Sequence, residues 1–201
     1  MINKEYISKE ENLTLELLKA VDLNKSLTQR SLAADLGIAL GLANIYVKKC
    51  VDKGFLKIKQ APKKRLFYYL TPKGFIEKAN LTKDFLRYSY NFYRRVKIEF
   101  NKLILDLEKK NFFNLVLSED SELAEIFLLA SLDNEINILG IIGKSENKKK
   151  RLGIEIFEQI PKKLNYDFII YTGDFISKDK ANKINKSFKN KIIFPEFLLK
   201  G

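Results

Sequence analysis

The chain has 201 residues, 46% of them hydrophobic and 31% charged, which suits one large globular domain or two small ones. It contains no histidine and a single cysteine, Cys50, which excludes an internal disulfide, a histidine-activated nucleophile and a zinc site of cysteine and histidine. No apolar run reaches the roughly 18 residues of a membrane span, and the polar start MINKEYISKEEN lacks a secretory signal, so we expect a cytoplasmic protein without a membrane partner.

The net charge of +12 is concentrated in the first half of the chain. Residues 1–110 carry 23 Lys and Arg against 12 Asp and Glu, whereas residues 111–201 carry 14 against 13. A genome rich in A·T pairs favours lysine codons, but it would enrich both halves of the chain in lysine equally. The asymmetry therefore points to an anionic partner for the first half.

Two short helices are predicted first. One is expected at about 12–22, with an inner face of Leu17, Leu18 and Val21. The next begins after Thr28, which suits the N-cap, although Ser31 stands where a capping box has glutamate, and Gly37 ends it in the left-handed conformation. Small residues that would let this helix cross its successor closely are Ala33, Ala34 and Gly37.

A third helix is predicted from about 40 to 53, closed by Gly54. Its inner face, by helical spacing, comprises Ala43, Val47, Cys50 and Val51. Its outer face comprises Gly41, Leu42, Asn44, Ile45, Lys48 and Lys49.

A hairpin follows, with strands at 55–59 and 66–70 and a basic turn at 60–65. Leu56 and Ile58 are expected to point inward, and the lysines between them outward. Thr71 and Pro72 then begin another helix. Three helices and a hairpin with a basic tip have the order of a winged helix-turn-helix.

The stretch 27–79 resembles the MarR-type regulators, in particular a branch associated with exopolysaccharide gene clusters. The first block of residues that carry the resemblance is Leu27, Thr28, Gln29, Arg30, Leu32, Ala33, Leu36, Gly37, Ile38, Leu40, Gly41, Asn44, Lys48, Asp52, Lys53, Gly54 and Lys57. The second block is Tyr69, Leu70, Thr71, Pro72, Lys73, Gly74, Glu77, Lys78, Ala79, Leu81 and Thr82.

The resemblance implies binding to double-stranded DNA, with the third helix in the major groove. Asn44 would pair with adenine, and Lys48 would reach guanine or a phosphate. Leu42 and Ile45 replace common polar readers, and would either contact thymine methyls or pack on a neighbouring element. The residues expected to contact DNA are Thr28, Gln29, Arg30, Gly41, Leu42, Asn44, Ile45, Lys48, Lys49, Lys57, Lys59, Lys63, Lys64 and Arg65.

A long helix is predicted to continue to about residue 110, because apolar residues recur every three or four positions without proline. We expect this connector to form a homodimer, since helix-turn-helix proteins commonly read two half-sites. Packing on its own domains is the alternative. The expected interface residues are Phe85, Tyr88, Phe92, Val96, Phe100, Leu103 and Leu107.

Residues 111–201 change to alternating strands and helices, which predicts a small parallel α/β sheet. The strands are expected at 112–117, 136–143, 166–173 and 191–195, and the helices at 121–132 and 177–189. The order is similar to the small Rossmann-like domains of CoA-binding proteins and sugar-modifying acyltransferases, through SELAEI and LGIEIF (152–157).

The phosphate-binding glycines of those domains are missing, so this domain is a degenerate one. The first turn is Ser118-Glu119-Asp120-Ser121, whose carboxylates would repel a phosphate, and Gly143-Lys144 replaces a ribose-binding acid. We therefore expect no cofactor. Glu119, Asp120 and Glu122 would form either a metal or acid–base cluster or, as we expect, a solvated loop.

The predicted fold is an α+β winged helix-turn-helix with a long connector helix, followed by a small α/β Rossmann-like domain with a parallel sheet. The domains are expected at 1–80, 81–110 and 111–201. The predicted function is sequence-specific regulation of transcription, with a C-terminal domain for assembly or sensing and without catalysis, resident metal or cofactor. The sequence does not identify a small-molecule effector. The alternatives are a protein-interaction module, an enzyme acting on sugar nucleotides and a non-specific architectural DNA binder.

Overall fold

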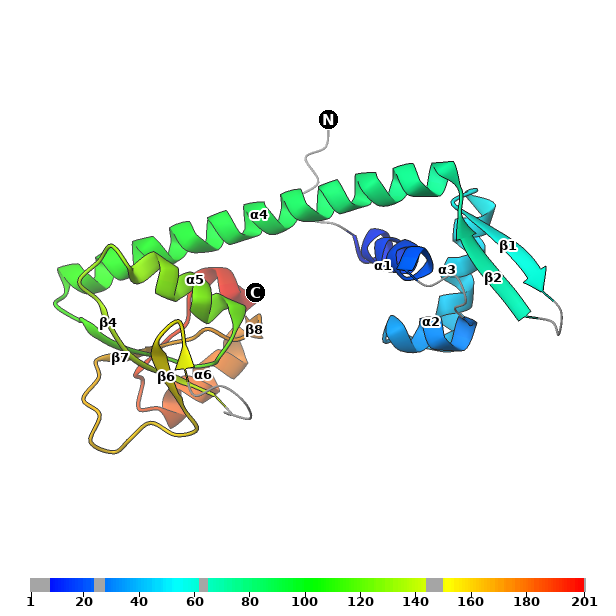
Figure 1. The fold of residues 1–201 in the computed structure, drawn as a ribbon. Coiled ribbons are helices and arrows are strands. Elements are labelled where there is room, and N and C mark those ends of the chain that lie inside the picture. Colours follow the sequence, from blue (N-terminus) through cyan, green and yellow to red (C-terminus); the bar gives the residue numbers. More distant parts are fainter. Residues whose placement is uncertain (1–7, 24–27, 62–64, 144–149, 201) are drawn as a thin grey trace. The chain divides into compact units, whose positions relative to one another are not determined.

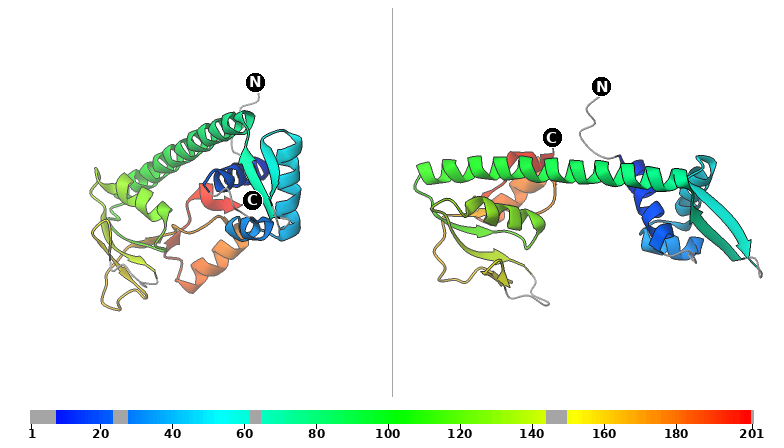
Figure 2. Two further views of the ribbon diagram at one scale, coloured as in Figure 1. Left: turned by 45° about the vertical axis from the view of Figure 1, so that its right-hand side comes forward. Right: turned by 45° about the horizontal axis from the view of Figure 1, so that its top comes forward.

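The computed structural model describes residues 8–23, 28–61, 65–143 and 150–200 (Figure 1). The chain divides into two compact units, residues 1–91 and 92–201. The division falls inside helix α4 (Pro72–Lys109), so the helix that we expected to be a separate segment at 81–110 contributes to both units. Figure 2 shows α4 as one unbroken helix from two further directions.

The first unit is a winged helix-turn-helix. Its described elements before α4 are α1 (Lys9–Leu23), α2 (Gln29–Asp35), α3 (Leu40–Asp52), β1 (Leu56–Ala61) and β2 (Arg65–Leu70). The strands β1 and β2 pair antiparallel, with Leu56 opposite Leu70 and Ala61 opposite Arg65. The predicted order of elements is confirmed.

Helices α2 and α3 form a sharp turn because their ends are specified locally. The N-cap hydroxyl of Thr28 accepts a hydrogen bond from the Ser31 amide at 3.1 Å, and the Ser31 hydroxyl accepts one from the Thr28 amide at 3.0 Å. This is a complete capping box built on serine, which sequence analysis ranked below glutamate. Gly37 follows at φ +61°, as predicted, and the two helix axes differ by 105°.

The core of the first unit joins α1, α2, α3, the wing and the start of α4. The predicted inner residues of α1 are buried, together with Leu15. Ala33 is buried but Ala34 is exposed, so Ala34 does not serve the close crossing that we expected. Leu56 is buried, but Ile58 is exposed rather than inward as predicted; the buried side chain at this level of the hairpin is that of Tyr68, its partner on β2.

Thr71 fixes the start of α4 against the base of the wing. Its hydroxyl donates to the Gly54 carbonyl at 2.6 Å and accepts from the Gly74 amide at 3.0 Å. The Thr71 amide donates to the Phe55 carbonyl at 3.0 Å. The side chain therefore caps α4 and holds the turn after α3 at the same time.

The second unit is built on a mainly parallel sheet. Its described strands in the order of the sheet are β5 (Lys150–Arg151), β6 (Ile154–Phe157), β4 (Asn137–Ile142), β3 (Asn114–Leu117), β7 (Phe168–Ile170) and β9 (Ile192–Ile193). All neighbours are parallel except β5 and β6. Further elements are α5 (Glu122–Ser131), α6 (Lys178–Ser187), η2 (Glu196–Leu198) and the short parallel pair β8 (Ile176–Ser177) and β10 (Leu199–Lys200).

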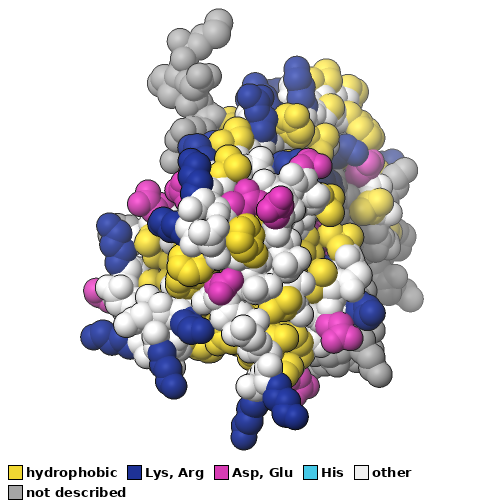
Figure 3. All heavy atoms as spheres, turned by 90° about the vertical axis from the view of Figure 1, so that its left-hand side faces the viewer, with side chains coloured by type: hydrophobic (Ala, Val, Ile, Leu, Met, Phe, Trp, Pro, Cys, Tyr) yellow, Lys and Arg dark blue, Asp and Glu magenta, His cyan; other side chains and the backbone are white. Residues whose placement is uncertain are grey.

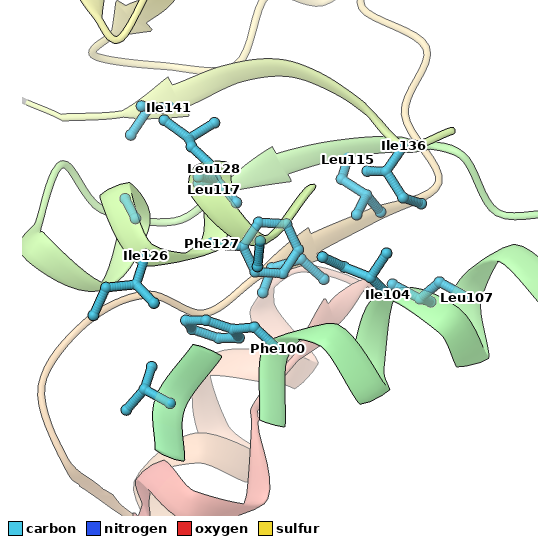
Figure 4. Close-up of a cluster of buried hydrophobic side chains, with 14 residues drawn as sticks. Phe100, Ile104, Leu107, Leu115, Leu117, Ile126, Phe127, Leu128, Ile136 and Ile141 are labelled. Carbon is cyan, nitrogen blue, oxygen red and sulfur yellow. The ribbon is translucent and has the colours of Figure 1, made fainter. Parts of the chain in front are cut away.

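The two faces of this sheet have separate cores, as the alternation of side chains along β3 requires. Leu115 and Leu117 face a cluster with α4 and α5, in which Phe100 and Phe127 meet edge to face at 5.0 Å (Figure 4). Val116 faces the other cluster, with Ala181 of α6. Thus the C-terminal part of α4 is one of the layers of the second unit.

That packing corrects the predicted dimer interface. Val96, Phe100 and Leu107 are buried in the core of the second unit, and Leu103 packs against it. Phe85 packs against the core of the first unit. These five side chains contact their own domains, which is the alternative that the sequence left open. Of the predicted set, Phe92 is exposed and Tyr88 is half-buried.

Among the described residues, no single helix has both the length and the apolar character of a membrane span. Helices α2 and α3 meet that test only as a bent pair, and both contribute buried side chains to the core of the first unit.

Candidate nucleic-acid interface

Helix α3 buries one face and leaves the other open, as its pattern predicted. Ala43, Val47 and Cys50 are buried against the rest of the first unit. Burial raises the pKa of the Cys50 thiol to about 11, opposed by Lys53 and supported by Glu77. Cys50 is therefore a neutral core residue at physiological pH.

The N-terminal half of the outer face is apolar. Leu40, Leu42 and Ile45 are 41%, 37% and 53% exposed, and a side chain added at Gly41 would meet no atom within 4 Å. Leu42 and Ile45 thus keep open surface on this face, Ile45 more than Leu42. Sequence analysis missed Leu40, although its position one turn before Asn44 places it beside the same face.

Asn44 differs from the prediction. The residue is only half-buried, but its carbonyl oxygen Oδ1 is buried without a hydrogen-bond partner among the described residues. Pairing with both edge groups of an adenine needs this oxygen as an acceptor. Asn44 can make that pair only after its side chain rotates.

The two lysines of α3 are placed differently. Lys48 is exposed. The ammonium group of Lys49 lies 3.1 Å from the Glu10 carboxylate of α1 and 5.4 Å from the centre of the Tyr46 ring. Lys49 is therefore partly neutralised within the first unit, and Lys48 is the stronger candidate for contact with a polyanion.

The remaining predicted contacts lie on α2 and the wing. Thr28 and Arg30 are exposed, Gln29 is half-buried, and the Thr28 hydroxyl is engaged in the cap of α2. Lys57 and Lys59 are exposed on β1. Lys63, Lys64 and the side chain of Arg65 lie outside the described residues.

A polar cavity of about 270 Å³ lies behind α3, where sequence analysis predicted nothing. Its lining residues are Ser8, Glu10, Glu11, Thr14, Lys53, Glu77 and Leu81. They come from α1, the end of α3 and the start of α4, so only the folded chain brings them together. Within the described part of the chain, no three acidic or cysteine side chains are placed to hold a metal ion.

The strand ends of the second unit, where α/β sheets often bind ligands, are closed by hydrogen bonds in this protein. Thr172, after β7, is fully buried; its hydroxyl accepts from the Glu119 amide at 3.1 Å and donates to the Glu119 carbonyl at 2.9 Å. The Ser121 hydroxyl, the N-cap of α5, donates to the Thr172 carbonyl at 2.5 Å, and the Ser118 hydroxyl accepts from the Thr172 amide at 3.0 Å. The polar groups of the loops after β3 and β7 are thus hydrogen-bonded to each other.

The three acidic residues of the first loop are not brought together into one site. Arg151 forms ion pairs with Asp120 and with Glu125, the latter at 2.6 Å, whereas Glu122 is exposed. The Glu119 carboxylate lies beside Gly173, and desolvation there, with the nearby Asp174, raises its pKa while Lys180 opposes the shift. Figure 3 shows acidic and basic side chains interspersed on the side of the molecule that it views.

Comparison with known proteins supports the N-terminal site. Residues 11–57 match the profile of the winged helix-turn-helix DNA-binding family. No curated protein sequence matches the chain. The match covers α1, α2, α3 and the first residues of β1.

Among solved structures, the PcaV transcriptional regulator from Streptomyces coelicolor is 18% identical, with a TM-score of 0.44 over 54% of this chain and 81% of that one. Sso10a-2, a DNA-binding protein from Sulfolobus solfataricus, is 21% identical, with a TM-score of 0.38 over 44% and 88%. MepR, a transcription regulator of a multidrug efflux pump of Staphylococcus aureus, is 20% identical, with a TM-score of 0.38 over 44% and 65%. Other similar structures are MarR-family regulators. The family match over residues 11–57 and the order of elements agree that the N-terminal unit has a winged helix-turn-helix fold, similar to that of a DNA-binding family.

Proposed function

We propose that the protein is a sequence-specific transcriptional regulator that inserts α3 into the major groove of double-stranded DNA. The observation that carries this proposal is the open outer face of α3 within a segment that matches a DNA-binding family. In this arrangement α3 contacts base edges, while α2 and the wing contact the backbone. The resemblance to the exopolysaccharide-associated branch suggests surface-polysaccharide genes as targets.

The positive charges around α3 support this orientation. Lys48 lies on the last turns of α3, Arg30 is exposed on α2, and Lys57 and Lys59 are exposed on β1. They belong to the half of the chain that carries almost all of the net charge. A phosphate backbone would neutralise them and release its counterions.

We further propose that the protein is a homodimer whose contact lies on a different face of α4 from the one predicted. Besides Phe75 and Phe92, the exposed large apolar residues of α4 recur at combinations of three and four positions: Ile76, Leu86, Tyr90, Ile98 and Leu105. A second copy would cover this stripe, and a dimer would read two half-sites about 34–36 Å apart.

In this proposal the second unit is a Rossmann-like domain that serves in assembly or sensing. Numbered along the chain, its five parallel strands have the order 3-2-1-4-5, which is the order of a doubly wound Rossmann sheet without its sixth strand. The loops at the strand ends are joined by the hydrogen bonds around Thr172, and glycines are missing from the first turn. These features favour a Rossmann-like domain that no longer binds a dinucleotide.

The test of the regulator is selection of binding sites from random duplexes, followed by titration of the selected site with salt. We expect one enriched motif, and a slope of log affinity against log salt that flattens by about 0.9 for every phosphate contact removed. A duplex affinity without any enriched motif indicates an architectural binder. The absence of duplex affinity indicates a protein-interaction module, and either result refutes the regulator.

The test of the dimer is the molar mass in solution by light scattering. The variant Leu86→Glu/Tyr90→Glu places two charges in the exposed stripe and should be monomeric. Ser89→Glu adds a charge on another exposed face of the same turn and should remain dimeric. If the wild type is a monomer at all concentrations, or both variants remain dimers, this interface is wrong.

A further inference from the structure

We propose that Leu42 and Ile45 read the methyl groups of thymine, so that the preferred DNA sites carry T·A pairs beneath these two side chains. The inference rests on the proposed function and names the chemical class of sequence that α3 selects. It chooses between the two alternatives that the sequence left open for these residues, contact with thymine or packing within the chain.

The position of the two side chains is the first argument. They are separated by three positions on α3, so their Cβ atoms are neighbours on the helix surface, about 5–6 Å apart. Both are exposed, and Gly41 beside them leaves open space. Both therefore present apolar surface to whatever α3 contacts, Ile45 more than Leu42.

The chemistry of the groove is the second argument. The thymine C5-methyl is the apolar group that base pairs present in the major groove, whereas guanine, adenine and cytosine present hydrogen-bonding groups there. Leucine and isoleucine have neither donors nor acceptors in their side chains. Placing them over cytosine or guanine would desolvate those polar groups without replacing their hydrogen bonds with water, which is unfavourable.

The charges beside this apolar surface favour DNA over a protein as its occupant. Lys48 lies one turn further along α3, and Lys57 and Lys59 lie on the wing. An apolar surface bordered by cations is complementary to methyl groups bordered by phosphates. Asn44 does not present its Oδ1 to the groove in this conformation, because that oxygen is buried.

The experiment uses the full chain and the site obtained by selection. Each thymine of that site is replaced singly by deoxyuridine, which removes the methyl group and keeps the hydrogen-bonding pattern. At one to three positions we expect the affinity to fall about fourfold, because burial of one group the size of a methylene changes an affinity by about this factor. Deoxyuridine at the other thymines should leave the affinity unchanged.

Two protein variants assign the effect to the named side chains. Ile45→Ala and Leu42→Ala should bind the thymine site more weakly, and each should lose its sensitivity to deoxyuridine at the position that it contacts. Leu23→Ala truncates another exposed leucine, at the end of α1, and should keep the full sensitivity. Because these side chains are exposed, circular dichroism should show folded variants.

The outcomes separate this inference from the proposal on which it rests. A selected site that tolerates deoxyuridine at every thymine overturns the methyl readout and leaves the regulator intact. Sensitivity that persists in both Ile45→Ala and Leu42→Ala overturns the assignment to these residues. Failure to select any site overturns the regulator and the methyl readout together.

Discussion

The carbonyl oxygen of Phe55 occupies the place where a side chain at Gly74 would begin. Phe55 lies between α3 and β1, and Gly74 lies in the first turn of α4. The close approach lets Thr71 bond both the turn after α3 and the amide of Gly74. The start of the long helix is thereby fixed to the base of the wing.

Replacing Gly74 by alanine should therefore destabilise the protein. Alanine ordinarily stabilises a helix by about 1 kcal/mol relative to glycine. At this position the added carbon overlaps a backbone oxygen, which cannot move as a flexible side chain can, so we expect a net loss of about 1–3 kcal/mol in the free energy of unfolding. Chemical denaturation measures this loss.

Gly41→Ala is the matched control, because Gly41 also lies in the first turn of a helix and has open space around it. Its free energy of unfolding should stay the same or rise. Equal changes in the two variants would contradict the steric argument.

The winged helix-turn-helix was predictable because its signals are local. Thr28 and Gly37 mark the two ends of α2 through hydrogen bonding and a positive φ, and Gly54 closes α3 at φ +74°. The inner face of α3 follows from helical spacing alone. Ser31, which stands where a capping box has glutamate, completes the box through its hydroxyl, which accepts from the Thr28 amide at 3.0 Å.

The apolar faces of the helices and strands were easier to predict than the surfaces that pack against them. The stripe of Val96 and Phe100 was recognised correctly as buried, but the sequence does not state whether a second copy or the same chain covers it. Likewise Ile154–Phe157 becomes strand β6 only because it pairs with β4, and two residues of β5 complete that edge. The burial of the Asn44 oxygen and the closure around Thr172 depend on tertiary contacts and left no signal in the sequence.

The wing lysines should control the salt dependence of DNA binding. Lys57 and Lys59 are exposed on β1, and the variant Lys57→Ala/Lys59→Ala should lower the slope of log affinity against log salt by up to about 1.8. Affinity should fall for all duplex sequences alike, because phosphates carry no sequence information. Lys102→Ala removes an exposed lysine of the second unit that pairs with Glu99, and its slope should match the wild type. Equal slopes in all three proteins would exclude Lys57 and Lys59 from the interface.

The Cys50 thiol should be inert in the folded protein. It is 2% exposed, and burial raises its pKa to about 11, so at pH 8 the reactive thiolate is scarce as well as inaccessible. A chromogenic disulfide reagent should label it only slowly in buffer and rapidly in denaturant. Labelling should accelerate with denaturant in step with unfolding measured by circular dichroism. Rapid labelling under native conditions would show that α3 separates from its core.

The contribution of Glu119 to the stability of the second unit should be more favourable at acidic than at neutral pH. Its folded pKa is raised above the ordinary 4.5 by desolvation and by Asp174, so the folded state resists ionisation of this carboxyl more than the unfolded state does. The stabilisation is complete below the unfolded pKa and is lost as the pH rises through the folded pKa.

The variant Glu119→Gln tests this dependence. It should be more stable than the wild type at pH 7, and the gain should shrink as the pH falls towards 4, as measured by denaturation at several pH values. Glu158→Gln removes a charge from another exposed residue of the same unit and controls for net charge. A gain that is constant over this range, or that grows on acidification, would reverse the sign that we infer.

The variant Phe100→Ala tests whether the buried apolar face of α4 packs within the chain or against a second subunit. It is 0% exposed and meets the rings of Phe127 and Phe197 at 5.0 and 5.4 Å, so Phe100→Ala should cost about 3–5 kcal/mol of unfolding free energy. Leu105→Ala, little more than one turn away on the exposed side, should cost about 0.5 kcal/mol or less in the monomer. In the core the cost of Phe100→Ala is independent of protein concentration. At a subunit contact the cost would shrink with dilution, because the wild type then loses the stabilisation by dimerisation that the variant already lacks. Denaturation at two concentrations a hundredfold apart distinguishes the two, because only dissociation follows mass action.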